Sequence, residues 1–155
     1  MSAVPVEPSA RRGTSDRTFV VSTTNDVARW NAFVASVAGS TFCHQAGWRD
    51  VMQSVLGHET SLLVATDETG EWRGVLPLVR VRSILGRYSI SMPFMNDGGP
   101  LGDDDAIAAL VEFAVADAEK SGAKLLELRS RRMLPGRVSP SGRKVAVHLS
   151  LPSTV

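Results

Sequence analysis

The stretch from Tyr88 to Ser130 constrains the fold of this chain more than any other part of it. Tyr88–Met92 predicts a short strand, and a turn segment rich in glycine, asparagine and proline follows. Asp103–Ser121 predicts a helix, because its apolar residues recur at helical spacing and Gly122 follows the last turn. Ala123–Ser130 predicts a second strand. Strand, helix and strand in this order form a crossover, so we expect parallel pairing within a mixed sheet.

Apolar patterns outside this stretch predict four more strands and two more helices. The strands are Thr18–Ser22, Ser61–Thr66, Trp72–Ser83 and Arg143–Leu151. The first helix is capped by Thr24, Asn25 or Asp26, carries Trp30, Phe33, Val34 and Val37 as its apolar stripe, and ends at Gly39. The second helix carries Trp48, Val51, Met52 and Val55 and stops at Gly57. Asp67–Glu71 predicts a hairpin turn, and Pro77 marks an edge or a bulge.

Together these elements predict an α/β fold class, of the α+β type with a mixed sheet. A chain of 155 residues with 43% hydrophobic residues can form one domain or one half of a larger one. We expect residues 1–16 to form a disordered tail and residues 17–155 to form the domain. The strand Arg143–Leu151 has one wholly apolar face, so we expect it to pack inside the sheet or to be followed by more protein.

Charge and cysteine content exclude several classes of protein. The net charge of +1 gives no global field that would attract nucleic acid or a membrane surface. A single cysteine, Cys43, rules out an internal disulfide framework. No apolar run approaches the roughly 20 residues of a membrane span, and the N-terminus lacks the apolar core of a signal peptide. We therefore expect a cytoplasmic protein.

Several short motifs, taken in order, resemble a known family. They are Phe42-x-His44 with Gly47-Trp48, then Gly74-Val75-Leu76-Pro77-Leu78, Ser83-x-Leu85-Gly86-Arg87, Ser91-x-Pro93-Phe94-x-Asn96-x-Gly98-Gly99 and Leu126-Glu127-Leu128-Arg129. The predicted helix and following strand are similar to the helix–strand segment of GNAT-type acyltransferases. The whole pattern resembles the N-terminal part of FemAB-like proteins, most closely the branch associated with the PEP-CTERM/exosortase system of exopolysaccharide-producing bacteria. The similarity covers residues 18–152.

This resemblance implies a GNAT-like fold and one half of an N-acyltransferase. FemAB-like enzymes have two fused GNAT-like halves and transfer an aminoacyl or acyl group to an amine; classical members extend a cell-wall peptide from aminoacyl-tRNA. The chain is similar to the first half, which implies that the second half, or a homo-oligomer partner, completes the catalytic groove. The implied acceptor is an amine on a small molecule, glycan or peptide, in cell-envelope or exopolysaccharide synthesis. The implied donor is acyl-coenzyme A or aminoacyl-tRNA.

The start of the predicted helix bears on donor binding. GNAT domains bind the donor pyrophosphate at a helix N-terminus, where free N–H groups and the helix dipole favour anions. Here that helix opens with Asp103-Asp104-Asp105, and Pro100 in the preceding loop lacks an N–H. Three carboxylates would repel a pyrophosphate, so we predict that this half binds no acyl-coenzyme A in the usual way.

The turn after Tyr88–Met92 supplies the main candidates for substrate binding. Asn96, Asp97, Gly98 and Gly99 would form an acceptor-binding loop at a strand end, or only a turn. Arg129 would grip a carboxylate or phosphate, or form a local ion pair with Glu127.

Two residues near the second helix are further candidates. Trp48 is a core anchor or an aromatic lid over a ligand. His44 is a candidate general base or acceptor contact, or a histidine that caps and packs. Adjacent side chains rarely point at each other, so Cys43 and His44 do not predict covalent catalysis. No spacing predicts a metal site, and the catalytic residues stay unassigned.

A basic segment supports a different function. It contains Arg129, Arg131, Arg132, Arg137, Arg143 and Lys144, and has no acidic residue between them. Such a segment would steer tRNA or a sugar phosphate, or is simply a solvated loop. Two alternatives to the enzyme half therefore remain: a non-catalytic GNAT-like binding or scaffold module, and a tRNA-contacting domain.

Overall fold

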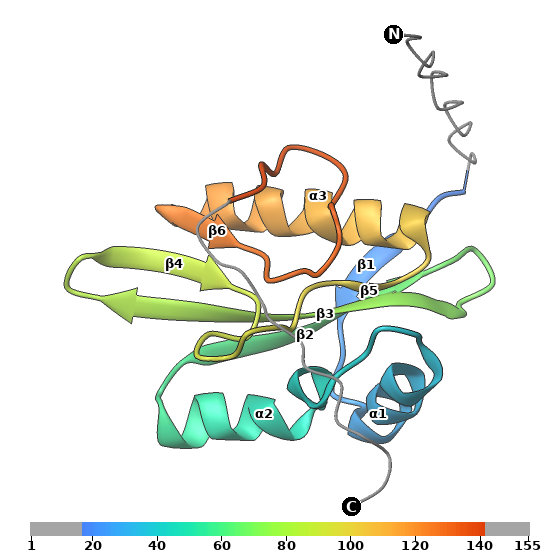
Figure 1. Cartoon of the computed structure of the whole chain (residues 1–155), viewed down its shortest axis with the longest axis horizontal. Coiled ribbons are helices and arrows are strands. Elements are labelled where there is room, and N and C mark those ends of the chain that lie inside the picture. The colour runs from blue at the N-terminus through green and yellow to red at the C-terminus, as the bar shows by residue number, and fades with distance from the viewer. Residues whose placement is uncertain (1–16, 142–155) are drawn as a thin grey trace, which may run out of the picture.

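The computed structural model describes residues 17–141, which form a six-stranded mixed sheet with helices on both faces (Figure 1). The strands are β1 Val20–Thr23, β2 Glu59–Thr66, β3 Trp72–Ser83, β4 Gly86–Ile90, β5 Leu101–Gly102 and β6 Leu125–Glu127. The helices are α1 Val27–Ser36, the 3₁₀ turn η1 Phe42–His44, α2 Gly47–Asp50, the π-turn η2 Val51–Val55 and α3 Asp104–Ser121. The expected tail 1–16 and strand Arg143–Leu151 lie outside the described residues.

The strand order is β1-β2-β3-β4-β6, and β5 pairs with β3 beside that path. β4 and β6 pair in parallel, with Tyr88 opposite Leu125 and Ile90 opposite Glu127, while the other pairs are antiparallel. The crossover through α3 is therefore confirmed. β4 begins and ends two residues earlier than the expected Tyr88–Met92, and β6, with three residues, is shorter than the expected Ala123–Ser130.

β3 has the predicted bounds, and its proline lies where the ladder is interrupted. Pro77 faces Leu62 of β2. On the other side of β3, β5 pairs with Gly74 and Val75, and β4 pairs only from Val79 onward. Pro77 thus lies between two partners and has a local edge on that side, where its missing N–H breaks no ladder bond with either strand. The bulge lies elsewhere, between Ala65 and Thr66.

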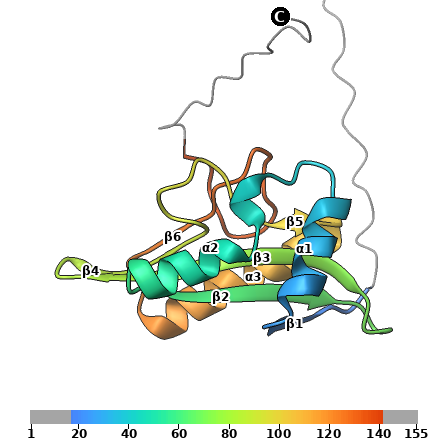
Figure 2. The ribbon, with the colours of Figure 1, turned by 90° about the horizontal axis from the view of Figure 1, so that it is seen from below.

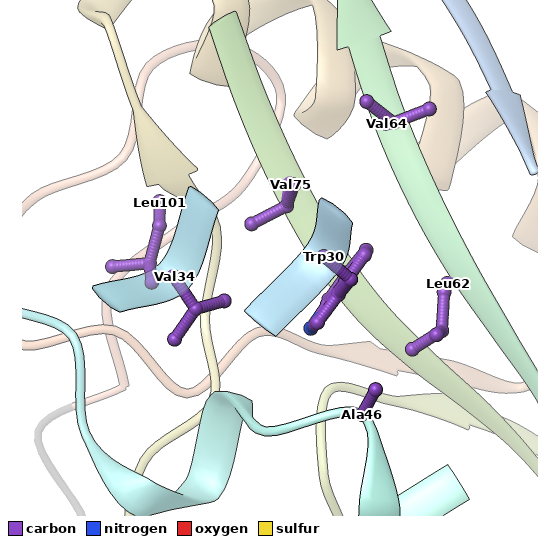
Figure 3. Close-up of a cluster of buried hydrophobic side chains, with 7 residues drawn as sticks. All are labelled: Trp30, Val34, Ala46, Leu62, Val64, Val75 and Leu101. Carbon is purple, nitrogen blue, oxygen red and sulfur yellow. The ribbon is translucent and has the colours of Figure 1, made fainter. Parts of the chain in front are cut away.

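The two faces of the sheet carry separate cores. On the α1 side, Trp30 packs with residues from β2, β3 and β5 (Figure 3); the cluster is Trp30, Val34, Ala46, Leu62, Val64, Val75 and Leu101. On the α3 side, the cluster is Leu63, Ala65, Leu76, Leu78, Ala106, Leu110 and Ala114. Consecutive strand residues point to opposite faces, so the uninterrupted apolar runs of β2 and β3 can fill both cores.

Helix α3 follows the sequence prediction closely. It begins after Asp103 and ends at Gly122, whose φ of +67° is the left-handed conformation of a C-terminal glycine. The expected stripe is buried: Ile107, Leu110, Val111, Ala114 and Ala118. Arg80 on β3 donates two hydrogen bonds to the Asp117 carboxylate, at 2.7 and 2.9 Å, which ties the helix to the sheet.

The segment after β1 departs more from expectation. α1 is capped by Asp26, whose side chain accepts from the Arg29 N–H at 2.9 Å, but it ends at Ser36 rather than Gly39. The expected second helix is an α-turn that widens into the π-turn η2. Because i→i+5 bonding shifts side chains off the 3.6-residue spacing, Val55 is exposed and only Met52 is fully buried. The predicted stripe there was wrong in this respect. Within 17–141 no helix combines the length and apolarity of a membrane span.

Candidate functional site

A pocket of about 250 Å³ lies at the start of α3. Its walls come from the loop after α1 with η1, from residues 91–103 between β4 and α3, and from the loop after β6. We call residues 91–103 the connecting segment. Figure 2 shows these three regions together along one side of the sheet, beside β3 and away from β2. Three predicted site residues, His44, Asp97 and Gly99, line this pocket.

The connecting segment has an unusual backbone. Met92 and Phe94 have positive φ angles of 49° and 68°, although neither is glycine. Such conformations cost free energy and persist where surrounding contacts fix them. At Gly99 an added Cβ would lie 2.8 Å from the carbonyl oxygen of Arg129, so the segment presses against the chain that leaves β6. Only glycine allows this close approach.

Arg129 holds the connecting segment in place. Its Nε lies 2.9 Å from Glu127 Oε1, so the predicted local ion pair is confirmed. Its Nη1 donates to the backbone carbonyls of Met92, at 3.3 Å, and Met95. The side chain is mostly buried. Arg129 therefore ties β6 to the connecting segment, and it does not line the pocket.

His44 is buried and makes hydrogen bonds through both ring nitrogens. The Thr41 N–H donates to Nδ1 at 3.1 Å, which assigns the ring proton to Nε2. Nε2 then donates to the carbonyl oxygen of Gly99 at 3.1 Å. Burial lowers the pKa of His44 below its usual 6.5, while nearby Asp97 opposes that shift. These bonds indicate a neutral histidine that positions the connecting segment. To act as a base, His44 would have to give up the hydrogen bond at Nδ1.

Asp97 presents the least satisfied polar group in the pocket. The residue is 6% exposed, and its Oδ1 accepts from the Gly98 N–H at 2.9 Å. Its Oδ2 lies 2.7 Å from Nε of Arg131, an ion pair whose alignment is too poor for a hydrogen bond. Oδ2 has no hydrogen-bond donor among the described residues. A ligand ammonium group that displaces Arg131 would therefore give this buried oxygen an aligned hydrogen-bond donor.

The other predicted residues lie outside the pocket lining. Asn96 is exposed, and Gly98 is buried against Met92. Trp48 is half-buried against the cluster formed by Met52, Val79 and Met92. Its Nε1 donates to the carbonyl of Phe42 at 2.9 Å. These contacts are those of a core anchor.

Three backbone amides that precede α3 are occupied. The Gly98 N–H donates to Asp97, the Gly99 N–H to the carbonyl of Arg129 at 2.8 Å, and the Asp103 N–H to the carbonyl of Arg73 at 3.0 Å. Three amides of the loop that would cradle a pyrophosphate thus already have acceptors inside the chain.

In the folded chain, the arginines of the basic segment lie next to acidic side chains from other parts of the sequence. Arg129, Arg131, Arg132 and Arg137 each form an ion pair with an acidic side chain. Arg132 reaches Asp104 on α3 at 3.1 Å, and Arg137 reaches Glu119 at 2.9 Å. The acidic partners come from the connecting segment, α3 and β6, so the sequence of the basic segment alone could not reveal them. Arg143 and Lys144 lie outside the described residues.

A second, more open pocket of about 400 Å³ lies beside β1, β2 and α2. Apart from Leu62 it is lined by polar residues, and sequence analysis missed it because those residues come from separate elements and form no motif. Arg49 there donates to Asn25 and Asp50, and Gln53 donates to the carbonyl of Thr60. With these polar groups partnered, we regard the smaller pocket at Asp97 as the better candidate despite its size.

In residues 17–141, no group of three or more His, Cys, Asp or Glu side chains is arranged to hold a metal ion. Comparison with protein-family models and with curated proteins found no match to this chain. The functional assignment therefore depends on the geometry of the pocket and on the motifs described above.

Proposed function

We propose that this chain is the acceptor-binding half of a FemAB-like N-acyltransferase, acting in the cytoplasm in cell-envelope or exopolysaccharide synthesis. The observation that carries the proposal is the buried Oδ2 of Asp97, a residue of the pocket lining, which has no hydrogen-bond donor within residues 17–141. An acceptor amine, bound as an ammonium group, takes the place of Arg131 at this oxygen and donates a hydrogen bond to it.

The fold supports this proposal. The GNAT resemblance implies a helix followed by a strand at residues 103–130, and α3 with β6 occupies that stretch as a parallel crossover. The motif Asn96-x-Gly98-Gly99 falls in the connecting segment that borders the pocket. The residues that carry the resemblance and the residues that form the pocket are therefore partly the same.

In the proposed reaction the amine nitrogen attacks an activated carbonyl carbon. The carbon–nitrogen bond forms, the donor's bond from carbonyl carbon to oxygen or sulfur breaks, and the amine loses a proton to a base outside the assigned residues. Asp97 binds and orients the acceptor, and His44 positions the loop through Gly99. Because three carboxylates lie at the start of α3 and the amides of the preceding loop have acceptors inside the chain, the donor binds on the second half or on a partner copy.

One alternative function has its own support. The same occupied amides and the acidic start of α3 are also expected for a GNAT-like binding module without catalysis. Acyl transfer by the chain together with its second half separates the two functions. The tRNA alternative loses support, because each arginine of the basic segment within 17–141 is paired.

The binding step can be tested on the full 155-residue chain by NMR titration. n-Butylamine is compared with n-butanol, and we expect only the amine to shift the amides of Gly98 and Gly99. Asp97→Asn removes these shifts. Asp105→Asn, which changes the same charge on α3 away from the pocket lining, retains them. Equal shifts with the alcohol, or wild-type amine binding by Asp97→Asn, would overturn the proposal.

A further inference from the structure

We infer that the ligand of the Asp97 pocket is an α-amino acid with a small aliphatic side chain, and that Arg131 binds its carboxylate. This inference rests on the proposed amine-binding site and narrows its substrate class. It starts from the pair formed by Asp97 and Arg131, which lie 2.7 Å apart at the pocket but differ in burial. The Asp97 side chain is 8% exposed and that of Arg131 54%.

Arg131 is placed to change its partner. Asp97 is its ion-pair partner among the described residues, and half of its side chain faces solvent. A guanidinium group carries five N–H donors in a planar fork that matches a carboxylate. When an ammonium group takes the place of Arg131 at Oδ2, the guanidinium remains close enough to bind an anion on the same ligand.

Electrostatics favours a ligand with both charges. The Asp97–Arg131 pair is neutral overall, and a zwitterion replaces it with two ion pairs without adding net charge. A carboxylate alone would bring a negative charge beside the buried Asp97. A phosphate would meet Asp97 together with Asp104, which already engages Arg132. An amine alone satisfies Asp97 but leaves the guanidinium without its anion.

The rest of the pocket matches a small aliphatic group. Pro100, Leu101 and Ile107 contribute buried apolar surface to the walls. At roughly 30 Å³ for a water-sized group, a pocket of about 250 Å³ holds on the order of eight non-hydrogen atoms. Norvaline has this size, with the ammonium at Asp97, the carboxylate at Arg131 and the propyl chain against the apolar wall.

The acyl-transfer reaction then has a defined product class. The α-amine of the amino acid attacks the donor carbonyl after losing a proton to a base, the donor's leaving group departs, and an N-acyl amino acid forms. The carboxylate stays with Arg131 throughout, because it takes no part in the bond changes.

Three matched compounds test the inference by calorimetry on the full chain: norvaline, n-butylamine, which lacks its carboxylate, and pentanoate, which lacks its amine. We expect norvaline to bind at least ten-fold more tightly than either. Arg131→Gln removes this preference and raises the affinity for n-butylamine, because the amine no longer competes with the guanidinium group for Asp97 Oδ2. Arg131→Lys retains part of the preference. Arg137→Gln is the matched control, since Arg137 pairs with Glu119 away from the pocket.

The outcomes separate this inference from the broader proposal. If n-butylamine binds as tightly as norvaline and Arg131→Gln has no effect, the amino-acid inference fails while the amine site stands. If norvaline and n-butylamine both fail to bind, the proposed function fails as well. An equal loss in Arg137→Gln would also overturn the role of Arg131, because the effect would then be one of general charge.

Discussion

The β2–β3 hairpin and the connecting segment are built in opposite ways. The hairpin buries apolar side chains on both faces and pairs through a nearly continuous register from Glu59 to Thr66. The connecting segment has four positive φ angles, at Met92, Phe94, Gly98 and Gly102, and buries the polar side chain of Asp97. The hairpin follows from local pattern, whereas the connecting segment depends on contacts with distant parts of the chain. The candidate ligand site belongs to the second kind of structure.

The largest effect is expected from Gly102→Ala in the connecting segment. The new Cβ would lie 2.1 Å from the carbonyl oxygen of Arg73, at a φ of +129° that alanine rarely adopts. We expect a loss of about 3 kcal/mol in the free energy of unfolding, measured by urea denaturation. Gly47→Ala in α2 is the control, because no atom lies within 4 Å and its φ is ordinary. Equal stability of the two variants would contradict the close packing of β5 on β3.

Trp30→Phe tests how the core supports the site. Trp30 is fully buried, and its Nε1 donates to the carbonyl oxygen of His44 at 2.7 Å. The variant loses this bond and leaves a buried carbonyl without a donor, so we expect a loss of about 2 kcal/mol in unfolding free energy. Amine binding should also weaken, because His44 positions Gly99. The control is Trp72→Phe, at a half-buried ring that packs edge-on against Phe33. Unchanged amine binding in Trp30→Phe would contradict this link.

The pH dependence of stability provides a smaller effect at the same position. Burial lowers the pKa of His44, so the unfolded chain takes up a proton at a higher pH than the folded chain does. The stability that the neutral histidine contributes is complete above pH 6.5 and is lost as the pH falls toward its lower folded-state pKa. The stability difference between wild type and His44→Gln should therefore shrink from pH 7.5 to pH 5 in chemical denaturation. Parallel stability curves would contradict a buried neutral ring.

The smallest effect is expected in the hairpin turn. The Asp67 carboxylate accepts hydrogen bonds first from the Thr69 side chain and then from Arg73, and these hold its pKa well below the usual 3.8. The Asp67 side chain is 15% exposed, and its hydrogen-bond donors all come from residues 69–73. Asp67→Asn should be slightly less stable than wild type near neutral pH. This difference should decrease below pH 3.8, because the unfolded wild-type chain then protonates Asp67 while the folded chain still holds it charged. A difference that stays constant with pH would mean that the charge is not involved.

The same contrast explains how much could be predicted from sequence. The sequence predicted β3, α3 with its Gly122 cap, and the parallel crossover. The apolar periodicity, the capping residues and the handedness of strand–helix–strand connections that specify these features can be read from neighbouring residues. β5 was missed, since two residues carry no pattern and their pairing requires a glycine at position 74 in another strand. The η2 turn was missed because apolar spacing alone cannot distinguish α from π hydrogen bonding.

For the site, the sequence indicated which residues were candidates, but it did not predict which of them would be in contact. Asp97, Gly99 and His44 were singled out from the sequence, and the structure brings them to one pocket. The contact between His44 and Gly99 spans 55 positions, and no local rule joins them. Arg131 was noted only as part of a basic segment. Its pairing with Asp97 depends on where the loop after β6 returns to the connecting segment.

The most direct measurement is a crystal structure of the full chain with norvaline bound. We predict the ammonium group within hydrogen-bond distance of Asp97 Oδ2, and the Arg131 guanidinium moved from that oxygen to the ligand carboxylate. A ligand bound in the polar pocket at Arg49, with the Asp97–Arg131 pair intact, would contradict the central claim.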